Sequence, residues 1–520
     1  MALARTRAVA LFGVDGQIVD VEAAITNGVP GLHLVGLPDT ALSEARDRVR
    51  AAIFNSGETW PNRHVTVSLF PASLPKRGSG FDLAISIAVL GASEALPADA
   101  CAGQVMIGEL GLDGRIRPVS GVLPAVLAAA DSGAETVIVA NGNVAEASLV
   151  PGVTVVGVGS LRALLARLRD LPPPQEPADE ATEPAGPSLH TDGLASRSRA
   201  RRGDLDLADV RGQAEGRKIL EISAAGGHHV CFMGPPGCGK TMLAERLPTL
   251  LPDLDRGAAL EVTAIHSVAG TLPAGQPLIT RPPFQAPHHT ASRAALVGGG
   301  SARMIQPGAA SLAHRGILFL DESPEFASGV LDGLRQPLEE GEVVIARSGA
   351  TARFPARFTM LLAANPCPCA APKTRDCSCA PSVRRRYLAR LSGPLLDRVD
   401  LKSRLKEVTR AELRYDLELA ESSKVVAERV LTARERTRTR LSDTPWRTNA
   451  EIPGRELRRR FAPASRALAT LDRPLSDGRL SARGLDRVVR VAWTLTDLTG
   501  KDKPTADEIN QALGLWEGRT

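Results

Sequence analysis

Residues 234–241 read Gly-Pro-Pro-Gly-Cys-Gly-Lys-Thr, and this stretch decides the fold around it. It matches the pattern G-x-x-x-x-G-K-T and lies between an apolar run, residues 230–233, and a segment of helical composition that starts at Met242. Glycines let backbone N–H groups converge on phosphate oxygens, the lysine reaches the outer phosphates, and the threonine hydroxyl suits Mg²⁺. The stretch predicts a phosphate-binding loop for a nucleoside triphosphate, formed by Gly234, Pro235, Pro236, Gly237, Cys238, Gly239, Lys240 and Thr241.

Two later apolar runs end in polar side chains that nucleotide hydrolysis needs. Residues 316–320 are followed by Asp321 and Glu322, and residues 358–364 are followed by Asn365. Short apolar runs are typical of buried parallel strands, which deliver the residues after them to one edge of the sheet. We expect Asp321 to complete the Mg²⁺ shell, Glu322 to orient and polarise the attacking water, and Asn365 to position that water.

Together the three motifs resemble an AAA+ ATPase, and four longer motifs narrow the resemblance. They are residues 281–292 (RPPFQAPHHTAS), 334–339 (LRQPLE), 364–369 (ANPCPC) and 392–400 (SGPLLDRVD). They closely resemble the magnesium-chelatase-like YifB/ComM family, and the resemblance covers nearly the whole chain. The family is similar to the chelatase motor subunit and to replicative helicase motors, and ComM members are described as hexameric DNA helicases that migrate branches during natural transformation.

The resemblance also implies two catalytic arginines. Arg398 matches the position at which related motors offer an arginine finger to the ATP of the adjacent subunit, so the enzyme would work only as a ring. The alternative is an intrachain salt bridge with Asp397 or Asp400. Arg483 begins a helical run and fits the sensor that reports γ-phosphate loss to a lid, and a solvated arginine on a helix face is its alternative.

The chain divides at residues 171–204, which are rich in Pro, Ala, Ser and acids and have the composition of a flexible linker. Residues 1–170 alternate strand-like and helical runs, residues 205–405 hold the ATPase motifs, and residues 406–520 are helical in pattern. We therefore expect an α/β multidomain protein. It has an α+β N-terminal domain, an AAA+ P-loop α/β core and a C-terminal α-helical lid of the magnesium-chelatase type.

The N-terminal domain resembles the Lon-protease catalytic domain, of ribosomal S5 domain 2-like fold, at residues 76–88 and 108–122. The Ser/Lys pair of that protease is expected to be absent. Asp82 stands about where the nucleophilic serine would be, and Leu123 and Ala125 occupy the stretch of the lysine. Ser79 is nearby, but a serine with no base has nothing to activate it. We interpret the domain as a former protease fold used for assembly or for contacts with DNA or a partner.

Four of the seven cysteines fall within thirteen residues. Two close pairs on a turn can surround one tetrahedral Zn²⁺, and we expect a structural zinc site at Cys367, Cys369, Cys377 and Cys379. The C-x-C spacing is tighter than the usual C-x₂-C, so reduced structural thiols and a redox pair stay open as alternatives.

Nucleic-acid contacts are expected between the two phosphate motifs, where ring motors place pore-facing insertions. His288 and His289 are candidates for contacting a strand or for sensing nucleotide state, with structural histidines as the alternative. Residues 424–440 carry six basic residues against two acids, which fits phosphate contacts or a solvated lid face. Aromatics make up only 3% of the chain, so Arg and Lys contacts to phosphate are favoured over base stacking.

The formal charge of +5 is compatible with nucleic acid but does not identify it. No apolar stretch approaches about 18 uncharged residues, so no membrane span is expected, and Asp15 interrupts the apolar N-terminus. A cytoplasmic location follows.

We expect an ATP-hydrolysing ring motor, by resemblance a homo-hexamer, that moves along or remodels branched or single-stranded DNA during recombination or natural transformation. One alternative is a chelatase motor that drives Mg²⁺ into a porphyrin with separate large subunits. The Lon-like N-terminal domain argues against it, because the resemblance to that motor is confined to the ATPase region. The other is an ATP-switched assembly or regulatory protein that does not act on DNA.

Overall fold

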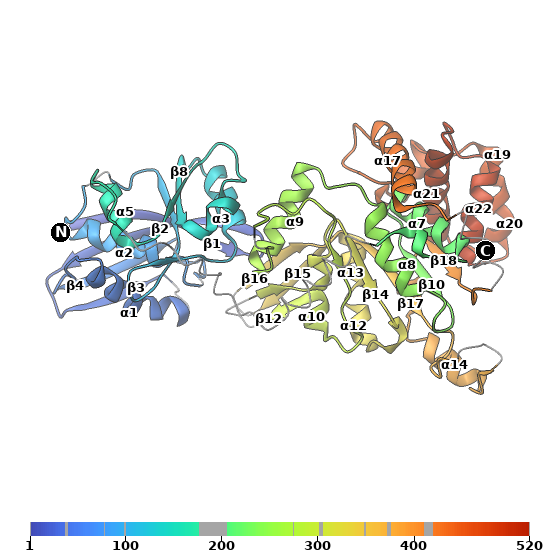
Figure 1. The fold of residues 1–520 in the computed structure, drawn as a ribbon, viewed down its shortest axis with the longest axis horizontal. Coiled ribbons are helices and arrows are strands. Elements are labelled where there is room, and N and C mark those ends of the chain that lie inside the picture. The colour runs from blue at the N-terminus through green and yellow to red at the C-terminus, as the bar shows by residue number, and fades with distance from the viewer. Residues whose placement is uncertain are drawn as a thin grey trace.

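Three bodies of secondary structure follow one another along the long axis of the molecule in the computed structural model (Figure 1). The predicted linker falls largely outside the described residues, and residues 171–175 form neither helix nor strand. Among the helices described, none combines the length and the apolar character that a bilayer crossing needs. The structure describes residues 2–36, 40–76, 78–97, 100–175, 205–273, 275–300, 305–347, 350–371, 376–409 and 420–518.

A seven-stranded sheet in the order β3-β4-β2-β1-β5-β8-β9 forms the N-terminal body. β1 and β2 make a long antiparallel hairpin, β4 pairs antiparallel with β2, and the other neighbours are parallel. Every second residue of β2 from Val19 to Ile25 is buried, as its apolar alternation requires. The strands are β1 Ala2–Phe12, β2 Asp15–Thr26, β3 Gly31–Val35, β4 His64–Phe70, β5 Gln104–Ile107, β6 Glu109–Leu110, β7 Ile116–Arg117, β8 Thr136–Ala140 and β9 Thr154–Val158.

Helices cover this sheet, and nearly every residue of α2 is buried among them. Such a helix, apolar on all sides, is typical of a core position. The helices of this body are α1 Thr40–Asn55, α2 Asp82–Ala92, α3 Val122–Asp131, the 3-10 turn η1 Asn141–Asn143, α4 Val144–Ala147 and α5 Leu161–Leu168.

Asp82 is a fully buried charged residue at the start of α2. Arg48 of α1 donates Nε to its Oδ2 at 2.7 Å and Nη2 to its Oδ1 at 3.1 Å, and the Leu110 N–H donates to Oδ2 at 3.3 Å. Burial raises the pKa of Asp82 to about 6, although Arg48 acts in the opposite direction. The residue that stands near the expected Lon nucleophile therefore joins two helices.

We expect the substitution Arg48→Met to destabilise the N-terminal body by about 3 kcal/mol, because it leaves the Asp82 carboxylate buried without its partner. A buried carboxyl group with a raised pKa is most stable when neutral. The loss should therefore grow as the pH rises through that pKa, and be larger at about pH 8 than at about pH 5. The loss in the free energy of unfolding is measured by denaturant unfolding at both pH values, with hydrogen exchange of β4 amides as the probe of the N-terminal body. Arg50→Met, at an exposed position of the same helix, is the control, and equal losses at the two positions would contradict the prediction.

Five parallel strands in the order β11-β14-β17-β10-β18 form the core of the second body. Alternate residues of β14 pack on opposite faces, with Ile317 and Phe319 in one apolar cluster and Leu318 and Leu320 in another. Because the middle of the sheet is buried on both faces, its three central strands, β14, β17 and β10, are largely apolar runs. The strands are β10 Val230–Met233, β11 Phe284–Gln285, β14 Ile317–Leu320, β17 Thr359–Ala364 and β18 Leu401–Arg404.

Two antiparallel pairs and several helices complete this body. The pairs are β12 Gly298–Gly300 with β13 Ile305–Pro307, and β15 Glu342–Arg347 with β16 Ala350–Pro355. The helices are η2 Leu207–Asp209, α7 Ala214–Gly226, α8 Lys240–Arg246, η3 Leu247–Leu250, α9 Arg256–Val268, α10 Arg293–Val297, α11 Ala309–Leu312, η4 Ser323–Glu325, α12 Ser328–Asp332, α13 Arg335–Glu340, α14 Pro381–Leu388 and α15 Gly393–Leu396.

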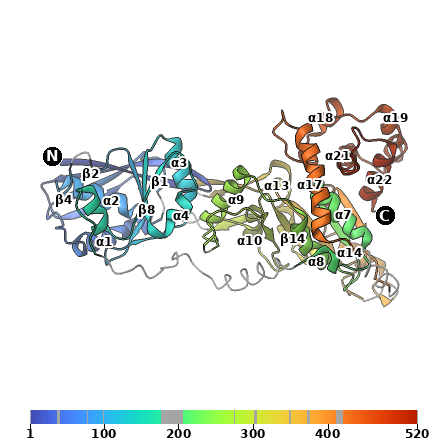
Figure 2. The same cartoon turned by 45° about the horizontal axis from the view of Figure 1, so that its top comes forward.

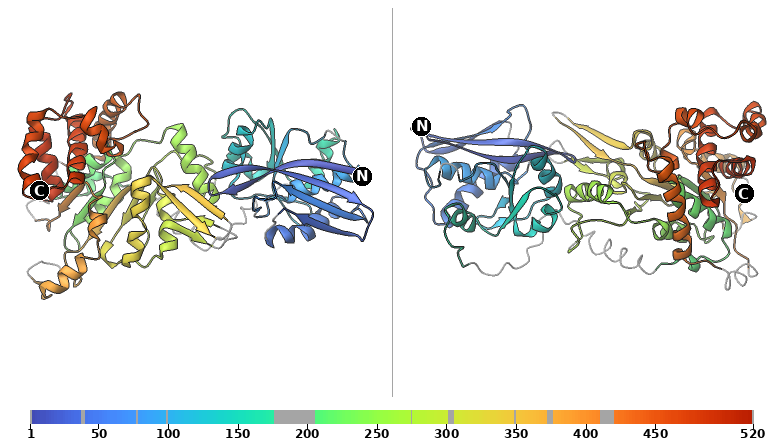
Figure 3. Two further views of the ribbon diagram at one scale, coloured as in Figure 1. Left: turned by 180° about the vertical axis from the view of Figure 1, so that it is seen from behind. Right: turned by 90° about the horizontal axis from the view of Figure 1, so that it is seen from above.

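The third body is all helical and lies beside the core at the C-terminal end of the molecule (Figure 3). One continuous cluster of buried apolar side chains joins β10 and α7 of the core to α17, α21 and α22 of this body. Its helices are α17 Ser423–Arg440, η6 Asn449–Glu451, α18 Gly454–Arg459, α19 Ser465–Leu468, η7 Ala469–Leu471, α20 Asp472–Ser476, α21 Ala482–Thr499 and α22 Ala506–Glu517.

Several arginines of α17 are held by contacts within the chain. Arg429 pairs with Glu221 and Glu421, both at 2.6 Å, Arg434 donates to the Ala224 carbonyl at 2.8 Å, and Arg440 pairs with Asp497. The basic composition of this helix therefore serves in part to fix the helical body to the core, a use that its sequence does not reveal.

The first two bodies meet where α3 packs against α9 (Figure 2). Ala264 of α9 belongs to the same buried apolar cluster as α3, and the partly buried Leu260 packs against that cluster. The Gly121 N–H donates to the Ser267 carbonyl at 3.1 Å, and the Ser267 hydroxyl donates to the buried carboxyl group of Glu146. The N-terminal body is thus attached through side chains as well as through residues 171–204.

Candidate functional site

The loop of residues 234–239 connects β10 to α8 and has the backbone that a phosphate-binding loop requires. A Cβ on Gly234 would lie 2.7 Å from Cys238 Sγ and from the Leu405 carbonyl oxygen, so only glycine fits there. Gly239, the residue before α8, has φ +92, which L side chains rarely adopt. Cys238 is buried at 2% exposure, which explains the small side chain at that position.

Lys240 lies with its ammonium among neutral oxygens. Its Nζ donates to the carbonyl oxygens of Gly234 at 2.7 Å and Pro235 at 2.9 Å, and to Asn365 Oδ1 at 3.0 Å. The side chain is buried, at 8% exposure. A buried cation that is held by neutral acceptors favours an anionic ligand, since charge-assisted hydrogen bonds to phosphate are stronger. The structure therefore brings Asn365 at the end of β17 next to the loop.

Thr241 and Asp321, which follow different strands of the sheet, are also in contact. The Thr241 hydroxyl donates to Asp321 Oδ2 at 2.8 Å, and the Glu322 N–H donates to Asp321 Oδ1, also at 2.8 Å. A hydroxyl and a carboxylate oxygen are ligands that fit Mg²⁺, which keeps several waters and takes few protein ligands. Glu322 has φ +48, an uncommon conformation for a residue with a side chain, and its side chain is half exposed.

His289 contacts Glu322, although the two residues lie in separate motifs of the sequence. His289 Nδ1 lies 3.1 Å from Glu322 Oε2, and the His288 ring lies 4.1 Å from the His289 ring between centroids. His288 Nδ1 in turn lies 2.9 Å from Thr290 Oγ1. Because β11 pairs in parallel with β14, the chain after each strand leaves the sheet at the same edge. The sequence alone does not show that these two strands pair, so it does not predict that His289 and Glu322 come together.

Arg398 lies in an intrachain ion pair, but with a residue other than the two that the sequence suggested. Its guanidinium donates to Glu339 Oε1 and to the Pro394 carbonyl. The Arg398 side chain is 10% exposed, and its Nε is buried without a hydrogen-bond partner among the described residues. The partner Glu339 belongs to the 334–339 motif, so two of the long motifs meet here.

Arg483 is exposed on the first turn of α21, where the Ser481 hydroxyl caps the helix by accepting from the Gly484 N–H at 3.0 Å. Arg487, one turn further on, reaches the core and pairs with Asp400 Oδ1 at 2.6 Å. No motif in the sequence marks Arg487. The contact joins the helical body to the start of β18.

Asp400 is the centre of a buried polar network between the core and α21. The His229 N–H donates to its Oδ2 at 3.1 Å, and His228 Nδ1 lies 3.6 Å from the same oxygen. Burial alone would raise the pKa of Asp400, but Arg487 and His228 hold that pKa well below its usual range. Burial lowers the pKa of His229 to about 4, so its ring is neutral at pH 7, and its Nδ1 accepts from the Met360 N–H at 2.9 Å.

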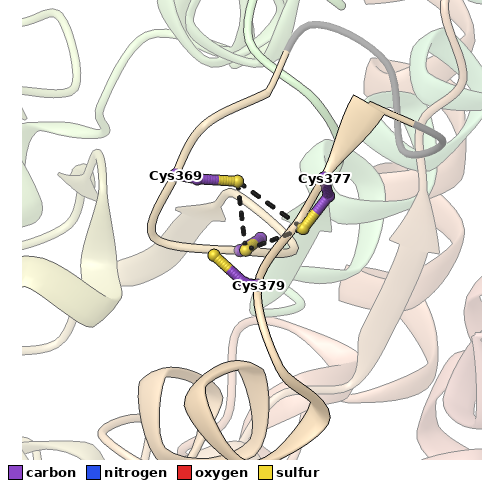
Figure 4. Close-up of side chains that lie close together, drawn as sticks. Cys369, Cys377 and Cys379 are labelled. Atoms are coloured by element: carbon purple, nitrogen blue, oxygen red, sulfur yellow. Dashed lines mark hydrogen bonds between the residues drawn. The ribbon is translucent and has the colours of Figure 1, made fainter.

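The four clustered cysteines come together in the chain after β17, and Figure 4 shows three of them, Cys369, Cys377 and Cys379. Their Sγ atoms all lie within 4.8 Å of one another. Three of the distances are 3.3 Å from Cys369 to Cys367, 3.5 Å from Cys369 to Cys377 and 3.2 Å from Cys377 to Cys367. Cys367 is buried, Cys369 is exposed, and Cys377 and Cys379 are intermediate.

Ser79 has a carboxylate partner in the N-terminal body. Its hydroxyl donates to Glu109 Oε2, so the expectation of a serine with no basic group nearby needs correction. Leu123 and Ala125 are buried apolar residues of α3. The Lys76 ammonium, three residues before Ser79, donates to the Pro71 carbonyl.

Family models match three stretches of the chain. The model described as "Magnesium chelatase, subunit ChlI" matches residues 206–413, "Subunit ChlI of Mg-chelatase" matches residues 21–143, and "Magnesium chelatase, subunit ChlI C-terminal" matches residues 420–515. The second match lies in the N-terminal body. The premise that the chelatase resemblance is confined to the ATPase region is therefore wrong.

Relatives match over almost the full length. An uncharacterized protein of Mycobacterium tuberculosis is 51% identical over 99% of both chains. YifB of Escherichia coli is 40% identical and the competence protein ComM of Haemophilus influenzae is 39% identical, each over 99% of this chain and 97% of the relative. Lon protease of Geobacter metallireducens is 27% identical over 179 residues, which are 32% of this chain and 22% of that one.

The predicted fold class is confirmed, because the mixed α/β bodies with a parallel-stranded core agree with both kinds of match. The AAA+ family implies ATP hydrolysis with Mg²⁺, and its members commonly form oligomeric rings. The chain belongs to the YifB/ComM family of magnesium-chelatase-like AAA+ ATPases.

Proposed function

We propose that this chain is a ring motor, in the form of a hexamer, that uses ATP hydrolysis to move along or remodel DNA at branched intermediates. One observation supports the assignment of the ATPase site. The Lys240–Asn365 and Thr241–Asp321 hydrogen bonds gather the ends of three parallel strands around one loop. Likeness to a competence protein over the full length supports DNA as the substrate on which the motor acts.

The roles of the site residues follow from their contacts. Lys240 exchanges its carbonyl and amide partners for phosphate oxygens, while loop N–H groups hold the phosphates. Thr241 and Asp321 would hold Mg²⁺, which neutralises developing charge on the phosphates. Glu322 orients the attacking water and takes up its proton, and Asn365 positions that water. In this proposal, Arg483 on α21 reports the loss of the γ-phosphate to the helical body.

The adjacent subunit supplies Arg398 to this site. Within one chain, Arg398 is held by Glu339 rather than by any residue of the phosphate loop. Its buried Nε has no hydrogen-bond partner in the part of the chain that the structure describes, which leaves one donor uncommitted there. In the ring, the guanidinium binds the γ-phosphate of the neighbour's ATP instead, and a ring is therefore required for turnover.

ATP turnover in the presence of different DNA forms tests the proposal. The wild-type protein is assayed for phosphate release alone and with linear duplex, single strands or a four-way junction. We expect branched DNA to raise turnover most. Equal rates with and without every DNA would remove DNA from the proposal.

A chelatase motor is the second candidate, since family models of that subunit match in all three bodies of the chain. Such a motor acts with separate large subunits on a porphyrin. Turnover that is unaffected by DNA, but is raised by a protein partner that carries a porphyrin, would favour this candidate.

We expect His289→Ala to raise basal ATP turnover without DNA by about 2–5-fold and to reduce further stimulation by DNA. In our proposal, the His289 contact at 3.1 Å keeps Glu322 away from the attacking water until DNA binds. Half-exposed pairs of this kind contribute about 0.5–1 kcal/mol, which corresponds to that factor.

His288→Ala is the matched control, because His288 contacts Thr290 and the His289 ring but has no hydrogen bond to Glu322 among the described residues. Phosphate release with and without a four-way junction measures both variants. A fall in basal turnover in His289→Ala would show that the contact assists hydrolysis and would contradict this prediction.

A further inference from the structure

We propose that Cys367, Cys369, Cys377 and Cys379 bind one structural Zn²⁺, and that this ion fixes the segment that joins the Asn365 and Glu322 ends of the ATPase site. The metal site stands on its own geometry. Its effect on turnover rests on the ATPase function proposed above. The two parts therefore have separate measurements.

The distances between sulfur atoms are short enough for one common tetrahedral centre. Zn–S bonds of about 2.3 Å in a tetrahedron place neighbouring sulfurs about 3.8 Å apart. Here three distances are 3.2–3.5 Å, and all four Sγ atoms lie within 4.8 Å. A disulfide needs about 2.05 Å, so none of the three measured pairs is a closed disulfide. Cys369, Cys377 and Cys379 point toward one another in Figure 4.

A nearby arginine favours a metal-bound form of the cluster. Zn²⁺ with four thiolates carries a net charge of −2, which a cation close by stabilises. Arg384 lines a small cavity, of about 30 Å³, together with Cys367 and Cys377. Four soft thiolates are also the donor set that selects zinc over Mg²⁺, so the ion differs from the one expected at Thr241.

The cluster begins next to one catalytic strand end. Asn365, which accepts from Lys240 Nζ at 3.0 Å, is followed two residues later by Cys367. Cys367 is 4% exposed and thus fixed against the core. A metal ion bound to Cys367 would restrict the segment of chain that follows Asn365.

The C-terminal part of the segment contacts the turn that follows Glu322. Cys379 lies two residues before α14, and Arg390, two residues after it, donates to the Pro324 carbonyl at 3.2 Å and to Glu325 Oε2 at 3.3 Å. Glu325 closes the η4 turn that follows Glu322. The cysteine cluster and α14 therefore bridge the two strand ends, and a metal ion adds rigidity to that bridge.

Metal content of the full-length protein is the first measurement. The protein is purified without chelators, and zinc and iron are determined by elemental analysis for the wild type, Cys369→Ser/Cys379→Ser and Cys101→Ser. Cys101 lies in the N-terminal body and outside the cluster. We expect one zinc per chain in the wild type and in Cys101→Ser, and almost none in the double variant. No zinc in the wild type, or iron with visible absorbance, would overturn the site.

Turnover and nucleotide binding test the positioning role. We expect the double variant to lose about 10-fold in kcat for ATP while binding a fluorescent ATP analogue nearly as well, since supporting interactions of metal sites carry effects of this size. Circular dichroism and gel filtration establish that it is folded, and Cys379→His, which keeps a zinc ligand, should restore both zinc and turnover. Loss of zinc with unchanged kcat would reject the positioning role, whereas a low kcat in the zinc-loaded wild type would count against the proposed ATPase instead.

Discussion

Substitution Glu322→Gln is expected to lower the kcat for ATP hydrolysis by about 10²–10⁴-fold, the range that a positioned general base contributes. The amide keeps the shape of the side chain but cannot accept the proton of the attacking water. Lys240, Thr241 and Asp321 keep their contacts, which do not involve the Glu322 side chain. ATP binding should therefore be nearly unchanged.

Phosphate release measures kcat, and titration with a fluorescent ATP analogue measures nucleotide binding, so the two effects can be separated. Glu340→Gln, at an exposed position of α13, is the matched control and should retain wild-type turnover. A Glu322→Gln protein that hydrolyses ATP at more than about a tenth of the wild-type rate would mean that another group acts as the base.

Arg398→Ala is expected to cause the other large loss, of about 10³–10⁵-fold in kcat, which is typical of arginine fingers. A structural role is a competing explanation, because Arg398 pairs with Glu339 in the same chain. Glu339→Gln separates the two. It removes the intrachain carboxylate but keeps the arginine, so it should retain most of the turnover if Arg398 acts on the neighbour.

A mixture of two inactive variants tests whether Arg398 acts between subunits. Lys240→Ala cannot use its own site but still carries Arg398, whereas Arg398→Ala has an intact site of its own. Mixed rings should regain turnover wherever the intact ATP site of an Arg398→Ala subunit faces the Arg398 of a Lys240→Ala subunit. Absence of any recovery, with mixed rings demonstrated by gel filtration of labelled subunits, would contradict an intersubunit arginine.

The parts of the fold that the sequence predicts are those encoded by short, local patterns. The phosphate loop at Gly234–Thr241 is readable because glycine, lysine and threonine each have a distinct task there. The β14 and β17 strands are readable because both faces of a parallel sheet are buried, which leaves unbroken apolar runs. Alternation along β2 likewise predicts its buried face.

The contacts that escaped prediction join residues far apart in the chain. Glu339 and Arg398 are 59 positions apart, and Asp400 and Arg487 are 87 apart. His289 reaches Glu322 only because β11 pairs beside β14, and strand order is not encoded in either strand alone. The charge composition of α17 fits phosphate contacts or a solvated lid face, and it does not reveal that some of its arginines bind acids and carbonyls of the same chain.

Dissociation of a fluorescently labelled four-way junction, followed together with phosphate release in one reaction, tests the proposed motor most directly. The wild type with ATP should separate the junction arms while turnover rises, and Glu322→Gln with ATP should bind the junction without separating it. If the wild type hydrolyses ATP at the same rate with and without the junction and leaves it intact, the motor does not act on branched DNA.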